Sequence, residues 1–252
     1  MAIDAARPAE QDGVVDALLL KLMARDALAP QEERALRAAV SEIREYDAGR
    51  TIVRSGTPLG ESNLQLSGVT CRYKNLADGQ RQIMELHVPG DFVDLHGFLL
   101  KRLEHNVGAL TRARIAVVPH EALRKITEEH PHLARMLWFS TLLDAAIHRE
   151  KIVSVGRRTA IARIAHLFCE LFVRLQVVGL AGEDRFALPL TQADVADATG
   201  LTPVHVNRML KKLRDDGLLV FRGGEVSIQD WVRLQRVGEF DPSYLFLDRQ
   251  PR

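Results

Sequence analysis

The segment spanning residues 191–219 constrains the fold more than any other, because it contains start and stop signals for two short helices. Thr191 is a helix-capping residue, and Asp194 three positions later completes a capping-box-like pair. Gly200 is suited to end this helix, because glycine takes a positive φ at little cost. Thr202 caps a second helix, and the proline after it occupies the first helical position. The segment therefore predicts two helices joined by a tight turn.

The second of these helices has one apolar face and one basic face. Its apolar positions recur at three- and four-residue spacing and indicate the buried side: Val206, Met209, Leu210 and Leu213. The opposite face is polar or basic: His205, Asn207, Arg208, Lys211, Lys212 and Arg214. Arg and Asn side chains can pair bidentately with guanine and adenine edges. The pattern predicts a helix-turn-helix that binds DNA, with an αα-hairpin that only packs as the alternative.

Two short apolar runs follow this helix pair, one on each side of Gly223–Gly224. They are typical of a β-hairpin, because adjacent glycines accommodate a tight turn. A hairpin directly after the second helix predicts a winged helix-turn-helix.

Composition narrows the protein class. The 252 residues are 46% hydrophobic and 27% charged, which suits one large or two ordinary globular domains. A net charge of +1 means that any DNA-binding face must be a local patch. The two cysteines, Cys71 and Cys169, are too few for a disulfide framework or a four-cysteine iron–sulfur cluster. The chain shows neither a signal-peptide pattern nor an apolar run near the roughly 18 residues of a membrane helix, so we expect a cytoplasmic protein.

The chain before residue 191 changes its hydrophobic period. After a loose polar arm over residues 1–13, helices are expected at Val14–Met23 and Pro30–Arg44. Short alternating runs broken by turn residues then predict a β-sandwich or small barrel, followed by a helix at Glu121–Glu129. The predicted strands are Thr51–Arg54, Asn63–Leu66, Val69–Tyr73, Gln82–His87, Phe92–Asp94, Val107–Leu110 and Arg114–Val118.

Pro131 opens a long helix with an apolar stripe close to a and d spacing, formed by Leu133, Met136, Ser140, Leu143 and Ile147. The helix connects two domains, so we interpret the stripe as a dimer seam. Packing against the chain's own β-sandwich is the alternative. A hinge is expected over Gly156–Thr159, and Thr159 is expected to cap the next helix.

Together, the β-domain, the long helix and the winged helix-turn-helix resemble the cyclic-AMP receptor protein/FNR (Crp/Fnr) family of bacterial transcription regulators. The resemblance rests mainly on LTQADVADATGLTPVHVNRMLKKLRDDGLL, and PGDFVDLHGF lies where the family has its strand and turn near the effector pocket. It implies an α+β fold with an N-terminal jelly-roll (cyclic-nucleotide-binding-like) β-domain, a long dimerisation helix and a C-terminal winged helix-turn-helix. The expected domains are an arm and helix (1–30), a β-roll sensor (31–130), the dimerisation helix (131–156), the DNA-binding domain (157–236) and a tail (237–252).

The resemblance also implies a homodimer on double-stranded DNA, with RNA polymerase as a further partner. Arg208 matches the family's recognition-helix arginine that reads guanine. Asn207 and His205 are expected to reach bases, and Val204 replaces a frequent glutamate and offers a methyl contact with thymine. The expected phosphate contacts are Thr191, Gln192, Thr202, Lys211 and Lys212.

The effector pocket departs from the pattern of the family's cyclic-nucleotide binders. The ribose-binding pair of those proteins falls on Asp94–Leu95 here, and their phosphate-binding pair falls near Leu103–Glu104. An anionic phosphate needs a cation and hydrogen-bond donors, and this loop offers Leu and Glu instead. The expected function is a sequence-specific transcription regulator with a degenerate pocket, no cofactor, and either an unidentified small-molecule effector or none. The alternative is an activator that responds to cyclic AMP, cyclic GMP or cyclic di-GMP.

Some of the histidines are candidate metal or haem ligands. His96 and His105 flank the pocket strands, but no HxxxH or Cys/His spacing accompanies them, so no metal is expected. A cupin-like enzyme is an alternative from another class, with His87 and His96 as ligands, but the clustered HxH spacing is absent. The protein is therefore not expected to be an enzyme.

Overall fold

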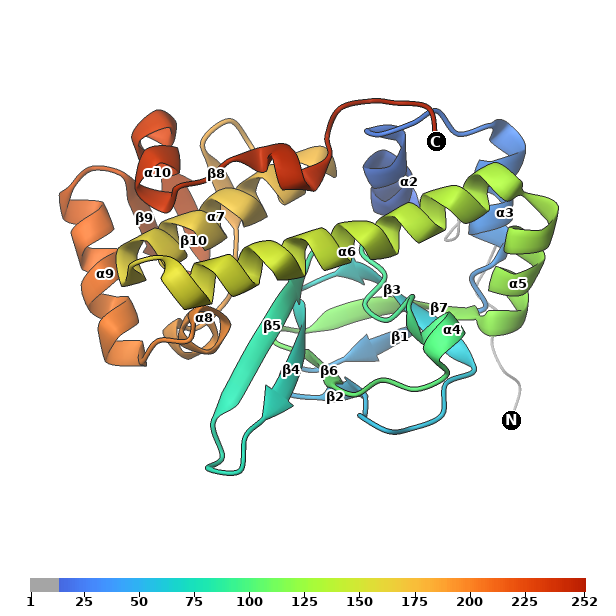
Figure 1. Cartoon of the computed structure of the whole chain (residues 1–252), viewed down its shortest axis with the longest axis horizontal. Helices are drawn as coiled ribbons and strands as arrows, with labels where there is room; N and C mark the ends of the chain where they lie inside the picture. Colours follow the sequence, from blue (N-terminus) through green and yellow to red (C-terminus); the bar gives the residue numbers. More distant parts are fainter. Residues whose placement is uncertain (1–13) are drawn as a thin grey trace. The chain divides into compact units, whose positions relative to one another are not determined.

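A computed structural model describes residues 14–252, shown in Figure 1. The polar arm expected over residues 1–13 lies outside the described residues. The described chain forms two compact units, one holding residues 14–70, 87–142 and 248–252, and the other residues 71–86 and 143–247. The long helix α6 (Pro131–Arg157) contributes residues to both. No helix within residues 14–252 has the length and apolarity needed to cross a bilayer.

The first unit combines short helices with antiparallel strands (Figure 1). Its elements before α6 are α2 (Asp16–Met23), α3 (Pro30–Ala38), β1 (Glu42–Tyr46), β2 (Thr51–Val53), β3 (Glu61–Ser67), α4 (Gly97–Leu100), β6 (Asn106–Ala109), β7 (Ala113–Pro119) and α5 (His120–Glu129). Strand β7 lies between β1 and β3, and β2 pairs with β6. Strands β2, β3, β6 and β7 confirm the predicted ones, with ends shifted by one or two residues, whereas β1 was not predicted.

The prediction that the second helix continues to Arg44 is wrong. Helix α3 ends at Ala38, and Ile43 lies in strand β1, where it is paired with Ala116 of β7. The helical spacing of Val40 and Ile43 is too short a signal to compete with a five-residue ladder of backbone hydrogen bonds to β7.

The predicted strand at Phe92–Asp94 is also absent. Phe92 makes one isolated bridge to Leu64 of β3. Further pairing stops because the Asp94 carboxylate accepts hydrogen bonds at 2.6 Å from both the backbone N–H and the side-chain amide of Asn63. A side chain therefore takes the donor that a continuing ladder would use.

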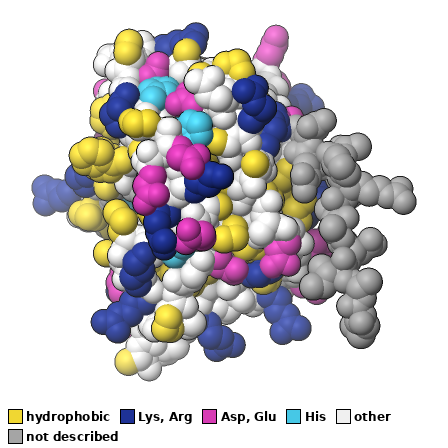
Figure 2. Space-filling view, turned by 90° about the vertical axis from the view of Figure 1, so that its right-hand side faces the viewer, with side chains coloured by type: hydrophobic (Ala, Val, Ile, Leu, Met, Phe, Trp, Pro, Cys, Tyr) yellow, Lys and Arg dark blue, Asp and Glu magenta, His cyan; other side chains and the backbone are white. Residues whose placement is uncertain are grey.

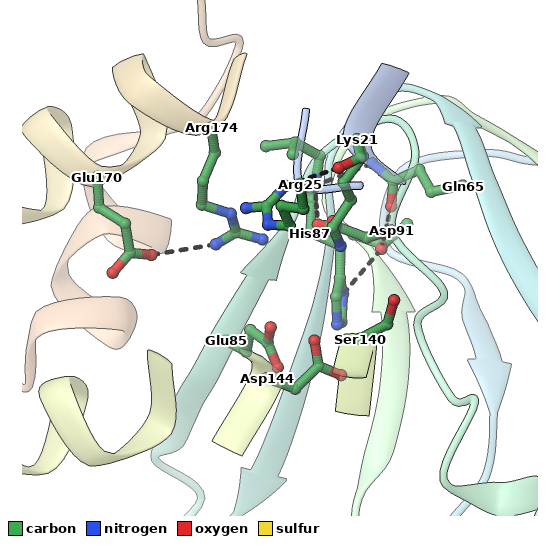
Figure 3. A network of polar contacts seen from close by, with 12 residues as sticks. Lys21, Arg25, Gln65, Glu85, His87, Asp91, Ser140, Asp144, Glu170 and Arg174 are labelled. Carbon is green, nitrogen blue, oxygen red and sulfur yellow. Dashed lines mark hydrogen bonds and ion pairs between the residues drawn. The ribbon is translucent and has the colours of Figure 1, made fainter. Parts of the chain in front are cut away.

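The core of the first unit lies between the sheet and the helices. Its buried cluster includes Leu18 of α2, Phe92, Leu95, Leu123 of α5 and Met136 of α6. At its edge the Lys21 ammonium pairs with the Asp91 carboxylate at 2.6 Å (Figure 3).

Figure 2 shows one outer face of the molecule, on which basic, acidic and histidine side chains are interspersed. Among the described residues, that face therefore carries no extended patch of a single charge sign of the kind expected where DNA binds.

The second unit contains the hairpin made by β4 and β5, then the second half of α6 and the C-terminal elements. Its elements are β4 (Thr70–Asn75), β5 (Arg81–His87), α7 (Ala160–Val177), β8 (Arg185–Ala187), α8 (Gln192–Thr199), α9 (Pro203–Asp215), β9 (Leu219–Arg222), β10 (Glu225–Ile228), α10 (Trp231–Gly238) and the 3-10 helix η1 (Pro242–Leu245). Strand β10 lies between β8 and β9.

The expected hinge is shorter than predicted. Gly156 lies inside α6, which continues to Arg157, so only Arg158 and Thr159 separate α6 from α7. Thr159 caps α7 as predicted, because its hydroxyl accepts from the Ala162 N–H at 3.4 Å.

Candidate nucleic-acid interface

The first helix of the helix-turn-helix is fixed by the capping box that the sequence predicts. The Thr191 hydroxyl accepts from the Asp194 N–H at 3.1 Å, and Asp194 Oδ2 accepts from the Thr191 N–H at 3.0 Å. The helix ends at Gly200, which has a φ of 66°. Two orphan donors are therefore satisfied at the start of α8, and the turn has the left-handed residue that it requires.

The second helix, α9, begins at the predicted cap. The Thr202 hydroxyl accepts from the His205 N–H at 3.3 Å, and Pro203 is the first helical residue. Three of the four predicted apolar positions are buried, and the fourth, Met209, is half-buried. The opposite side of α9 is consequently left exposed.

The predicted base-contacting residues gather on this exposed side of α9. Val204 is 81% exposed, Asn207 and Arg208 are exposed, and His205 is half-buried. The Asn207 amide donates to Gln192 Oε1 of α8 at 3.1 Å. An exposed valine, amide and guanidinium on adjacent turns offer base edges a methyl group and two side chains capable of bidentate pairing.

The predicted phosphate-contacting residues surround that group. Thr191, Gln192 and Thr202 are exposed at the starts of α8 and α9, and Lys211 is exposed further along α9. Lys212 is exposed as well, and its ammonium is 3.0 Å from Asp216. Binding a phosphate through Lys212 therefore competes with this weak surface ion pair.

The predicted wing is confirmed as the hairpin of β9 and β10. Gly223 and Gly224 form its turn with φ values of 63° and 77°. Arg222 is exposed beside the turn, where it adds a cation that the sequence interpretation did not single out. Its position directly before two glycines was the available signal.

The dimer-seam residues expected on α6 face inward. Leu133, Met136, Leu143 and Ile147 are all at most 4% exposed within the single chain. Leu133 and Met136 belong to the core of the first unit. The assignment of these four side chains to a seam is corrected, because the apolar stripe on α6 packs inside the protomer.

The four expected effector-pocket positions are two leucines and two carboxylates that have partners within the chain. Asp94 is fully buried and accepts hydrogen bonds from Asn63. Leu95 lies in the main core cluster, and Leu103 lies in a second cluster. The exposed Glu104 pairs with His105 at 2.9 Å, and although burial raises the pKa of Glu104, this hydrogen bond lowers it overall to about 2. A cyclic phosphate would therefore meet carboxylates and leucines here.

A buried cation exists in the second unit, and acidic side chains engage it. The Arg72 guanidinium of β4 donates to Glu85 of β5 at 2.7 Å and to Asp144 of α6 at 2.8 Å. Figure 3 shows the Glu85 and Asp144 carboxylates beside each other. His148 Nε2 is 3.1 Å from the Glu85 carboxylate. An incoming anion would have to displace charge-assisted bonds to reach Arg72.

The histidines that are candidate metal ligands have other contacts. The rings of His96 and His105 are 5.5 Å apart, and His87 Nδ1 is 3.2 Å from the Thr70 hydroxyl. Within residues 14–252 no three His, Cys, Asp or Glu side chains gather as a metal centre would require. Cys71 and Cys169 are both buried, and burial raises the pKa of the Cys169 thiol.

Comparisons with known proteins agree with this geometry. Residues 43–130 match the model of the cyclic nucleotide-binding domain, and residues 162–237 match that of the Crp-like helix-turn-helix domain. The transcriptional activator protein FnrL of Cereibacter sphaeroides is 31% identical over 209 residues, which cover 81% of this chain and 83% of FnrL. The nitrogen fixation regulation protein FixK of Bradyrhizobium diazoefficiens is 30% identical over 210 residues, or 77% of this chain and 85% of FixK.

Among solved structures, FixK2 from Bradyrhizobium japonicum has a TM-score of 0.71 at 27% identity, and the match covers 78% of this chain and 96% of that one. These matches confirm the expected fold class of a cyclic-nucleotide-binding-like β-domain, a long helix and a C-terminal helix-turn-helix. The relatives are transcription regulators rather than enzymes, which sets the cupin-like alternative aside. The chain therefore belongs to the Crp/Fnr family of DNA-binding transcription regulators.

Proposed function

We propose that this regulator acts in the cytoplasm as a homodimer that reads a palindromic operator, with one α9 helix in each of two successive major grooves. The observation that carries the proposal is the exposed row Val204, Asn207 and Arg208 on α9. Arg208 donates to guanine O6 and N7, Asn207 pairs with adenine N6 and N7, and Val204 contacts a thymine methyl. His205 lies beside this row and adds a fourth base contact.

Phosphate contacts set the register of α9 in the groove. We assign them to Thr191, Gln192, Thr202, Lys211 and Lys212, which lie around the base-reading row. Neutral side chains and N–H groups at a helix start bind phosphate without sequence preference, and the two lysines add the salt-dependent part of the affinity.

The dimer face proposed here is the exposed side of α6. Trp138, Leu142, Ile152 and Val153 are between 47% and 68% exposed. At 3.6 residues per turn these four share one side of the helix, opposite the buried Leu133, Met136, Leu143 and Ile147. An exposed apolar stripe of this kind is typical of a surface that a partner covers. A second copy supplies the same stripe, as an isologous contact requires.

The β-domain of this chain is proposed to bind no cyclic nucleotide. Asp94, Leu95, Leu103 and Glu104 supply no cation for the phosphate, and Glu85 and Asp144 engage Arg72. We propose that DNA binding either needs no effector or answers to a small molecule of another class. RNA polymerase is proposed as the partner downstream, since the relative FnrL is named a transcriptional activator.

Selection of random duplex DNA by the purified, effector-free protein tests the function. The expected result is an enriched palindrome with half-site centres about 10–10.5 base pairs apart. Enrichment of a single half-site would contradict the dimer, and absence of enrichment would contradict effector-free binding. Calorimetry with cyclic AMP, cyclic GMP and cyclic di-GMP separates the proposal from a nucleotide-responsive activator: heat of binding with any of the three would overturn the assignment of a degenerate pocket.

A further inference from the structure

Helix α8, the first helix of the helix-turn-helix, is hydrogen-bonded to side chains from parts of the second unit that are distant in sequence. The Arg81 guanidinium of β5 donates from Nε to Asp197 Oδ2 at 2.7 Å and from a terminal nitrogen to Asp194 Oδ1 at 2.8 Å. The neighbouring Gln82 amide donates to the Asp197 carbonyl at 2.8 Å. The β4–β5 hairpin therefore binds α8 through both its acidic side chains and its backbone.

Two further cations meet the C-terminal end of α8. The Lys151 ammonium of α6 donates to the Ala198 carbonyl at 2.9 Å, and the Arg163 guanidinium of α7 donates to the Thr199 carbonyl at 3.3 Å. The last carbonyls of a helix lack partners within the helix and carry the negative end of its dipole. Lys151 and Arg163 satisfy these acceptors, and burial lowers the pKa of Lys151.

Asp194 links the Arg81 contact to the DNA-facing end of α8. Its Oδ1 binds Arg81, while its Oδ2 accepts from the N–H and the hydroxyl of Thr191. Thr191 and Gln192 stand at the start of α8, where phosphate contacts are proposed. A shift of the Arg81 guanidinium would therefore disturb the capping box that orients these residues.

The Arg81 contact is sheltered enough to matter energetically. The side chains of Arg81, Asp194 and Asp197 are 31%, 13% and 29% exposed. Burial alone would lower the pKa of Arg81, but the bonds to Asp197 and Asp194 outweigh it and raise the pKa. Partly buried, charge-assisted bonds from one planar guanidinium to two carboxylates fix geometry better than exposed pairs.

We propose that Arg81 is a positioning residue for DNA binding, acting through Asp194 and Asp197 to hold α8 in the orientation that presents Thr191 and Gln192 to phosphates. The inference rests on the DNA contacts proposed for α8. Arg81 lies within the segment matched by the cyclic nucleotide-binding domain, whereas both aspartates lie in the matched helix-turn-helix. The β4–β5 hairpin thus links the segment matched by the cyclic nucleotide-binding domain directly to the first helix of the helix-turn-helix.

The test compares full-length wild type with Arg81→Ala and Arg81→Lys, using operator affinity measured by fluorescence anisotropy over a range of salt concentrations. Loss of a charged, partly buried hydrogen-bond pair predicts operator binding about tenfold weaker for Arg81→Ala. The slope of log affinity against log salt stays unchanged, because the phosphate contacts that weaken are those of the neutral Thr191 and Gln192, and no cationic phosphate contact is removed. Arg81→Lys recovers little, since a point charge cannot bridge two carboxylates. Arg112→Ala is the matched control, because Arg112 is an exposed arginine paired with Glu45.

Two further readouts keep the proposal falsifiable. Amide hydrogen exchange of the DNA-free protein is expected to quicken in α8 of Arg81→Ala and not in the Arg112→Ala control. Relative to Arg81→Asp alone, the double variant Arg81→Asp with Asp197→Arg is expected to bind the operator at least threefold more tightly. No gain in affinity would overturn the pairing of Arg81 with Asp197. A salt slope lower by about one would make Arg81 a phosphate contact instead. Tighter operator binding by Arg81→Ala would make the hairpin inhibitory and overturn the proposal.

These outcomes differ from a failure of the proposed function. If wild type selects no operator, the proposed reading fails. Exchange in α8 still tests the contact then, and unchanged exchange in Arg81→Ala would refute the positioning role.

Discussion

The amide of Asn207 on α9 donates to Gln192 Oε1 on α8 across 3.1 Å, so the two helices of the helix-turn-helix share a contact at their exposed surface. The bond orients the amide that is proposed to read adenine. A side chain held by a neighbour loses less freedom when it binds a base.

Gln192→Ala should therefore weaken base discrimination at the position that Asn207 faces. The expected effect is a flatter base preference at one position in each half-site, measured by selection of random DNA. Gln229→Ala, which changes another exposed amide of the second unit, is the control. An unaltered preference would show that Asn207 needs no support from Gln192.

Arg208 and Lys211 should separate specificity from charge. Arg208→Ala is expected to cost about 1–3 kcal/mol on the best operator and to relax one base position, because a bidentate pair with guanine is lost. Lys211→Ala is expected to weaken all sequences alike and to reduce the salt slope by about one. Anisotropy titrations on matched and mismatched operators measure both, and an unchanged selectivity profile for Arg208→Ala would sink its assignment.

Trp138→Glu should shift the protein toward monomer. A carboxylate placed in the apolar stripe of α6 must be desolvated when a second copy covers it. Analytical ultracentrifugation measures the dimer dissociation constant, which we expect to rise at least tenfold. Lys125→Glu on the exposed side of α5 is the control. Wild-type dimerisation by Trp138→Glu would move the dimer face elsewhere.

His132 should make the stability of the protein depend on pH. Its ring nitrogens lie 2.9 Å from Glu32 and 3.2 Å from Asp26. Burial opposes protonation, but the hydrogen bonds to the two carboxylates outweigh it and raise the pKa of His132 above 6.5. The stabilisation is therefore complete below that value and is lost as pH rises through the raised pKa.

The measurement is the difference in unfolding free energy between wild type and His132→Gln at several pH values. The difference should be largest below the raised pKa of His132 and shrink as pH rises through that pKa. Burial lowers the pKa of His166, so the contribution of His166 to stability has the opposite pH dependence. That contribution is the same in both proteins and cancels in the difference. A difference that grows with pH would refute the charged state of His132.

Gly238 should tolerate no side chain. A Cβ built there would lie 2.8 Å from the backbone nitrogen of His166 and 3.0 Å from the Ala165 carbonyl carbon, where α10 crosses α7. Gly238→Ala is expected to destabilise by about 1–3 kcal/mol, because backbone must move to admit the methyl group. Gly60→Ala, with open space around its Cβ, is the matched control in thermal unfolding. Equal stabilities would show that α10 can shift freely.

The sequence by itself determined the helix-turn-helix, because its signals are local. The capping box of Thr191 and Asp194, the positive φ of Gly200 and the Thr202 cap each depend on residues within about one helical turn. The position of each cap also decides which side of α9 is buried, so the exposed row that is proposed to contact bases could be predicted. The same reasoning found the wing from its two glycines.

Only the tertiary structure decided the contacts that join distant segments. The stripe Leu133, Met136, Leu143 and Ile147 told that one side of α6 is covered, but not whether a partner or the chain's own core covers it. Ile43 became a strand residue because β7 lay beside it. Arg81 and Asp194 are 113 positions apart, so no spacing in the sequence could pair them. Helix and turn signals act over a few residues, whereas the partner of an apolar face or a charge is chosen by the packing of the whole chain.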